Sequence, residues 1–189
     1  MDYQALIDKY YPEDDNLKRL LIKHSRQVAD RCLTISRRHP ELKLDTVFLE
    51  ESAMLHDIGI RWCNAPDIFC VGDEPYIRHG LIGGRLLRQE GNERHARVCE
   101  RHTGTGLRQM PVSPSNWKGS DKPILPPDLL ESGFFVPEQL EEQVVCYADK
   151  FYSKSHPDRE LSVLDTAHSL EKFGAEGVKQ FLEWAKMFE

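Results

Sequence analysis

Residues 53–60 read AMLHDIGI and place a histidine and an aspartate side by side at the end of an apolar segment. Asp45 precedes this segment at a distance that suits a helix N-cap, and Gly59 is a typical residue for a helix end. A helix is therefore expected from Asp45 to about Gly59, with His56 on its apolar face. The His56-Asp57 doublet would then end a helix that packs against the protein interior.

Apolar residues recur at helical spacing over most of the chain, whereas the alternation typical of a strand is rare. A long apolar stripe runs from residue 17 to residue 35, contains His24, and ends before Pro40. Further helices are expected over 76–90, 93–102, from Pro137 to about 152, over 161–173 and over 175–188, and residues 60–75 are expected to form a loop. The predicted fold class is all-α.

One long irregular loop is expected over residues 104–136, because this stretch is rich in proline and glycine. A loop of this length in a compact domain often has a function. Trp117 and the Phe134-Phe135 pair suit contact with a flat group such as a base, and they equally suit the packing of a surface insertion. The chain is expected to form a single domain over 1–189, with a core of about 16–152 and the C-terminal helices of 161–188 packed on it.

The composition is that of a soluble globular protein, with 189 residues, 40% hydrophobic and 30% charged. The 25 Lys and Arg residues face 31 Asp and Glu residues, which gives a net charge of −6. Long nucleic acid requires a basic face, so an acidic chain argues against such a partner. No apolar run is long enough to span a membrane, and the N-terminus lacks the features of a signal peptide. These observations predict a cytoplasmic protein that binds neither long nucleic acid nor a membrane.

Four histidines and two aspartates occupy positions that should face the interior of the helices: His24, His56, Asp57, His79, His102 and Asp149. Each one alone is more often a hydrogen-bonded core residue than a ligand. Burying all six at separate places would be costly, because each polar group that is buried without a partner destabilises the fold by a few kcal/mol. A shared divalent cation would remove this cost, since neutral imidazoles and carboxylates are its ligands. A set of nitrogen and oxygen ligands without thiolate suits Mn, Fe, Co, Ni or Zn, and six of them suit two ions.

The order of these residues resembles the signature of the HD superfamily of metal-dependent phosphohydrolases. His24, the doublet in His56-Asp57-Ile58-Gly59 and Asp149 correspond to its HDIG variant, over about residues 20–152. His79 and His102 resemble the additional ligands of the two-metal branch. The resemblance implies an HD-domain helical bundle in which one metal is bound by His24, His56, Asp57 and Asp149, and a second by Asp57, His79 and His102. Small uncharacterised HDIG proteins and the symmetrical diadenosine tetraphosphate hydrolases share this arrangement.

The resemblance implies a phosphohydrolase that cleaves an ester or anhydride of a small nucleotide-like substrate with a metal-bridged hydroxide. Asp57, His79 and His102 would be catalytic. Arg61 and Lys150 are the first choices for binding substrate phosphates, and Arg78, Arg101 and Lys154 are further candidates. Two alternatives stay open: a non-catalytic regulatory module that binds metal or nucleotide, and a di-iron oxygenase. The expected partner is a small phosphorylated molecule, and a homodimer is left open.

Overall fold

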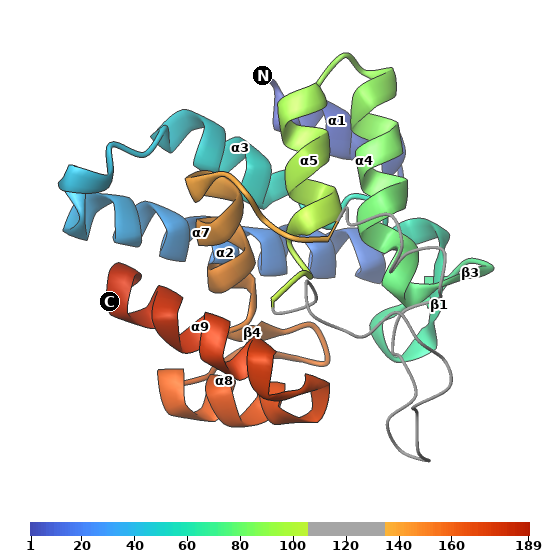
Figure 1. The fold of residues 1–189 in the computed structure, drawn as a ribbon. Coiled ribbons are helices and arrows are strands. Elements are labelled where there is room, and N and C mark those ends of the chain that lie inside the picture. The colour runs from blue at the N-terminus through green and yellow to red at the C-terminus, as the bar shows by residue number, and fades with distance from the viewer. Residues whose placement is uncertain (106–134) are drawn as a thin grey trace, which may run out of the picture.

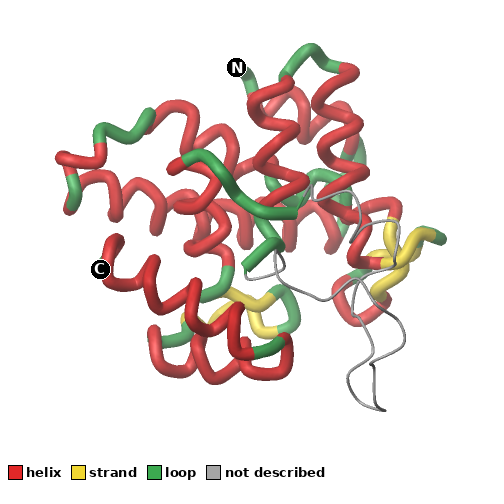
Figure 2. Tube along the Cα trace, in the orientation of Figure 1, coloured by secondary structure: helices red, strands yellow, loops and turns green. Residues whose placement is uncertain are grey.

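The structure, a computed structural model, describes residues 1–105 and 135–189. Helices dominate the described chain (Figures 1 and 2), and α2 crosses the middle of the molecule with α3 and α7 packed against it, while α4 pairs with α5. The helices are α1 (Tyr3–Tyr10), α2 (Asn16–Arg38), α3 (Thr46–Leu55), α4 (His79–Gln89), α5 (Glu93–Arg101), α7 (Leu140–Asp149), α8 (Val163–Leu170) and α9 (Ala175–Phe188). Within the described residues, none of these helices has the length and apolar character needed to cross a membrane.

Two small sheets show that the all-α fold class was wrong. The first sheet contains β1 (Cys63–Ala65), β2 (Cys70–Val71) and β3 (Glu74–Pro75) in the order β2-β1-β3, with β1 antiparallel to β2 and parallel to β3. All three strands lie within the stretch 60–75 that was expected to form a loop. The second sheet pairs β4 (Tyr152–Ser153) with β5 (His156–Glu160) in antiparallel fashion. β1 to β4 have only two or three residues, too few for an alternation that a sequence pattern could reveal, and β5 is exposed along most of its length.

The expected apolar stripe of α2 is buried as predicted, and its members include Leu17, Leu20, Leu21, His24, Val28, Cys32 and Ile35. The helix begins at Asn16, where the Asp15 side chain accepts a hydrogen bond from the Lys18 backbone N–H at 2.8 Å. The expected N-cap of α3 is confirmed, because Asp45 Oδ1 accepts from the Phe48 backbone N–H at 3.0 Å. These caps satisfy backbone donors that the first helical turn leaves free.

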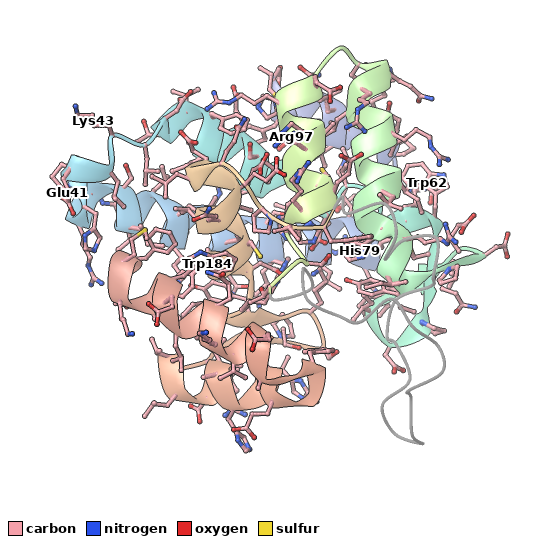
Figure 3. All side chains as sticks on the ribbon, in the orientation of Figure 1. Glu41, Lys43, Trp62, His79, Arg97 and Trp184 are labelled. Carbon is pink, nitrogen blue, oxygen red and sulfur yellow. The ribbon has the colours of Figure 1, made fainter. Side chains whose placement is uncertain are left out.

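The C-terminal helix α9 packs on α7 through aromatic rings. Tyr147 of α7 stacks on Phe181 with centroids 5.0 Å apart and meets the edge of Phe188 at 5.4 Å. Trp184, labelled in Figure 3, is also buried at 4% exposure. This packing fixes α7, whose last residue is Asp149. Most of the loop expected over 104–136 lies outside the described residues. The part left out is 106–134, which includes Trp117 and Phe134.

Gly59 allows the end of α3 to lie directly against the start of α4. A Cβ at Gly59 would lie 2.1 Å from the His79 carbonyl oxygen and 2.6 Å from the Gly83 backbone nitrogen. Both neighbours are backbone atoms of one helix, so neither can move without displacing α4. The close approach brings the residues that follow α3 next to His79.

We expect Gly59→Ala to lower the free energy of unfolding by about 1–3 kcal/mol, the range for overpacking a well-packed interior. Gly83→Ala is the matched control, because its Cβ would meet its nearest neighbours only at 3.3 Å and alanine favours the helix there. Chemical denaturation of both variants measures the difference. Equal stability of the two variants would contradict the close approach.

Candidate functional site

The structure brings all six predicted side chains together in one buried cluster. His24 lies within α2, His56 and Asp57 directly follow α3, and the other three lie at the ends of α4, α5 and α7. Figure 3 shows His79 at the end of α4 near the centre of the molecule. The side chains are between 0% and 4% exposed except for Asp149, at 13%. We call this the His/Asp cluster: His24, His56, Asp57, His79, His102 and Asp149.

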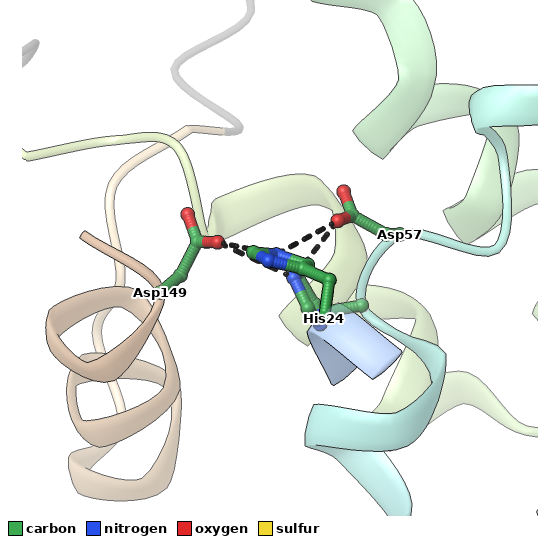
Figure 4. Close-up of side chains that lie close together, drawn as sticks. His24, Asp57 and Asp149 are labelled. Atoms are coloured by element: carbon green, nitrogen blue, oxygen red, sulfur yellow. Dashed lines mark hydrogen bonds and ion pairs between the residues drawn. The ribbon is translucent and has the colours of Figure 1, made fainter. Parts of the chain in front are cut away.

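One half of the cluster surrounds Asp57 Oδ2 and Asp149 Oδ1 (Figure 4). His24 Nε2 lies 3.2 Å from Asp57 Oδ2 and 3.0 Å from Asp149 Oδ1. His56 Nε2 lies 3.1 Å and 3.5 Å from the same two oxygens. Two carboxylates and two imidazoles from three separate helical segments therefore point at one small volume.

The other half of the cluster surrounds Asp57 Oδ1. His79 Nε2 and His102 Nε2 lie 3.3 Å and 3.5 Å from this oxygen. The two nitrogens are themselves only 3.0 Å apart. Asp57 thus belongs to both halves, one through each carboxylate oxygen.

Three imidazoles are oriented by the backbone in the same way. His56, His79 and His102 each donate from Nδ1–H to the carbonyl three residues earlier, at 2.7, 2.6 and 2.6 Å. A carbonyl cannot donate, so the proton must sit on Nδ1. When neutral, each ring then presents an unprotonated Nε2 to the cluster, which is the arrangement found in metal-binding histidines.

This orientation places hydrogen-bond acceptors against one another. The Nε2 lone pairs of His79 and His102 face each other and also face Asp57 Oδ1. Within the described residues, Asp57 Oδ1 and His56 Nε2 have no hydrogen-bond donor of ordinary geometry. Acceptors this close and this buried repel unless a proton or a cation lies between them.

The donor set fits a divalent cation. One ligand atom from each of His24, His56, Asp57 and Asp149 lies within 4.8 Å of the others, and the same holds for Asp57, His79 and His102. Both groups consist of imidazole nitrogen and carboxylate oxygen only, which suits a borderline or hard divalent ion.

The electrostatics of the cluster keep its two carboxylates ionised. Burial alone would raise the pKa of Asp57, but His56 and Lys154 outweigh this effect and hold that pKa well below its usual value. Burial would lower the pKa of His56, yet the two carboxylates raise it to about 9. Burial dominates at His79 and lowers its pKa to about 3. His79 is therefore neutral at neutral pH.

The residues predicted to bind phosphate differ in whether they contact the His/Asp cluster. Lys150 reaches the edge of the cluster, where its Nζ donates to Asp149 Oδ2 and to the His102 carbonyl, both at 2.9 Å. The Arg61 guanidinium lies instead over the Tyr11 ring, 5.7 Å from its centroid. Arg101 donates to the Val136 carbonyl at 2.6 Å. Of these three, only Lys150 contacts the cluster in the described part of the chain.

Two further residues adjoin the cluster. Lys154, predicted as a further candidate for binding phosphate, places its Nζ 2.6 Å from Asp57 Oδ2. Tyr76, which sequence reasoning missed, stacks on His79 with centroids 4.6 Å apart. The sequence signal for Tyr76 was its position three residues, or about one helical turn, before His79. At this spacing its carbonyl also accepts a hydrogen bond from His79 Nδ1–H.

Two curated relatives resemble the chain, and both are named tRNA (cytidine(56)-2'-O)-methyltransferase. The protein from Thermoplasma volcanium is 27% identical over 157 residues, which cover 82% of this chain and 38% of the relative. The protein from Picrophilus torridus is 26% identical over 163 residues, which cover 81% of this chain and 40% of the relative. The chain therefore spans about two fifths of the length of these relatives. No family model matches the chain, and no solved structure matches it.

These comparisons correct the functional expectations. The relatives are named for methyl transfer, which contradicts the HD phosphohydrolase, and they support neither alternative, the regulatory module or the oxygenase. The HD-domain bundle likewise finds no support. The expected cofactor, two transition metals that serve a hydrolase, was wrong as well, because methyl transfer consumes a methyl donor. The relatives' named substrate is tRNA, which contradicts the expectation of a small nucleotide and no long nucleic acid. The resemblance failed because a short set of common ligand residues does not specify one reaction.

We expect Asp57→Ala to lower the free energy of unfolding by about 3 kcal/mol in the presence of a chelator, because it leaves Lys154 and His56 without their shared counter-charge. Asp158→Ala is the control, since it removes an exposed partner of Lys23 on the surface and should change little. Denaturation at neutral pH measures both. A loss no larger than that of the control would show that Asp57 does not hold the cluster together.

Proposed function

We propose that the protein takes part in the 2′-O-methylation of tRNA. The observation that carries the proposal is the similarity to two tRNA (cytidine(56)-2'-O)-methyltransferases over more than four fifths of this chain. Because the chain spans about two fifths of each relative, it is proposed as one functional unit of such a system. A single domain over 1–189 and a cytoplasmic location, where tRNA is available, belong to the same proposal.

The reaction defines what such a unit must supply. A methyl carbon forms a bond to the ribose 2′ oxygen while its bond to the donor sulfur breaks, which leaves the donor as a thioether, and the proton of the 2′ hydroxyl passes to a basic group or to water. The donor that we propose is S-adenosylmethionine, which carries its methyl group on sulfur. The protein has to hold a polyanionic RNA strand in place while this exchange occurs, and phosphate contacts are what position nucleic acid.

The His/Asp cluster is the part of the chain that we assign to this task. We propose that its six side chains bind a divalent cation, with Asp57, His79 and His102 closest to the reacting groups. A bound cation would supply positive charge for phosphate oxygens on a chain that is acidic overall. Lys150, at the edge of the cluster, is the first choice for a direct phosphate contact, and Arg61 remains the second. The facing acceptor atoms of His79 and His102 support the cation.

Incubation of the purified chain with a tRNA transcript tests the proposal. We expect the chain to bind the transcript, and methyl-labelled S-adenosylmethionine shows whether it also transfers a methyl group to cytidine 56. The control transcript carries a 2′-deoxycytidine at that position, which has no hydroxyl to accept the group. Binding without transfer assigns the chain a tRNA-holding role, whereas neither binding nor transfer would refute the proposal.

A titration with Mn²⁺ tests the cation assignment separately. The wild-type chain, first treated with a chelator, is expected to bind Mn²⁺, and Asp57→Asn is expected to weaken binding by at least about tenfold because it removes the charge shared by both halves of the cluster. Asp158→Asn, which alters an exposed carboxylate, should leave the affinity unchanged. Calorimetry gives both constants, and equal affinity of the two variants would disprove the assignment.

A further inference from the structure

Lys154 occupies an unusual position for a lysine. It follows β4 in the turn that leads to β5, and its side chain extends inward to only 13% exposure. Its Nζ lies 2.6 Å from Asp57 Oδ2. Lysine is rarely buried without a close partner, so this contact is what keeps the ammonium inside.

The oxygen that Lys154 contacts is already shared. Asp57 Oδ2 lies 3.2 Å from His24 Nε2 and 3.1 Å from His56 Nε2, and these atoms belong to the group that could hold a cation. A divalent ion bound there would carry two positive charges to within coordination distance of Asp57. An ammonium 2.6 Å from the same oxygen would meet both steric overlap and like-charge repulsion.

The surrounding hairpin allows the lysine to move by itself. The β4–β5 hairpin is held on α2 by three contacts away from Lys154: Lys23 pairs with Asp158, Arg31 Nη1 lies 2.7 Å from Glu160, and Gln27 Nε2 donates to the Pro157 carbonyl at 3.0 Å. The backbone is therefore anchored on the far strand. The flexible four-carbon stem of Lys154 can leave the cluster by rotation of its own bonds.

We propose that Lys154 competes with a divalent cation for Asp57 and thereby sets the cation affinity of the cluster. The ammonium balances the buried carboxylate until a cation binds, and it then turns outward toward solvent, beside Lys150. The inference rests on the cation site proposed above. It assigns to Lys154 a role that neither a phosphate contact nor a structural lysine would have.

A Mn²⁺ titration of Lys154→Met tests the competition. Methionine keeps most of the apolar stem and removes the charge, so we expect Mn²⁺ to bind about tenfold or more tightly than to wild type. Without Mn²⁺ the variant should melt at a lower temperature than wild type, and added Mn²⁺ should raise its melting temperature by the larger amount. Lys186→Met, which removes an exposed charge on α9, is expected to match wild type in both measurements.

Labelling of the wild-type chain gives a second measurement that does not depend on the variant folding. Acetylation of lysines, read by mass spectrometry, should be slow at Lys154 without Mn²⁺ and faster once Mn²⁺ is bound, while Lys23 stays constant. Affinity equal to wild type in Lys154→Met, or labelling at Lys154 that does not rise with Mn²⁺, would overturn the competition and leave the cation site standing. Absence of Mn²⁺ binding in wild type and in Lys154→Met would overturn both proposals.

Discussion

A single buried carboxylate, that of Asp57, is the constraint on which the rest of the site depends. Its Oδ2 faces His24, His56 and Lys154, and its Oδ1 faces His79 and His102. An ionised carboxylate at 0% exposure costs several kcal/mol unless positive charge or hydrogen-bond donors surround it. Two of the histidines cannot donate to it, because their protons point at backbone carbonyls. The fold therefore needs positive charge at this point, and within the described chain His56 and Lys154 supply it.

The helix ends explain how so many imidazoles are aimed at one carboxylate. The last turn of a helix leaves carbonyl oxygens without an intrahelical partner. His56 follows α3 and uses the Ala53 carbonyl, and His102 follows α5 and uses the Cys99 carbonyl. The rings are thereby fixed without any additional polar side chain in the core. Convergence of the helix ends, made close by Gly59, then brings the remaining ring nitrogens together.

The sequence was sufficient for most of the helices, although not for α1, and for the membership of the cluster, but not for the reaction. The apolar stripe around His24 and the Asp45 cap could be predicted because periodicity and capping are local properties. The strands near Cys63 and Cys70 could not, since strands of two or three residues are defined by backbone pairing and are too short to carry a side-chain pattern. The contact between Lys154 and Asp57 joins residues almost a hundred positions apart and leaves no local pattern. The reaction was misjudged because imidazoles and carboxylates serve many chemistries, and only the relatives' names indicated methyl transfer.

The proposed role in tRNA methylation requires an acidic chain to concentrate its positive charge in one place. Many surface cations are neutralised by close partners, such as Arg26 by Glu50 at 2.7 Å and Arg94 by Asp45 at 2.9 Å. At physiological ionic strength such paired charges exert little field beyond about 8 Å. In the proposed function the attraction for phosphate comes from the cation assigned to the His/Asp cluster, because Lys150 is itself paired with Asp149 at 2.9 Å. A site of this kind would neutralise few phosphates, so the proposed affinity for RNA would fall only gently with added salt, unlike that of a protein with a broad basic face.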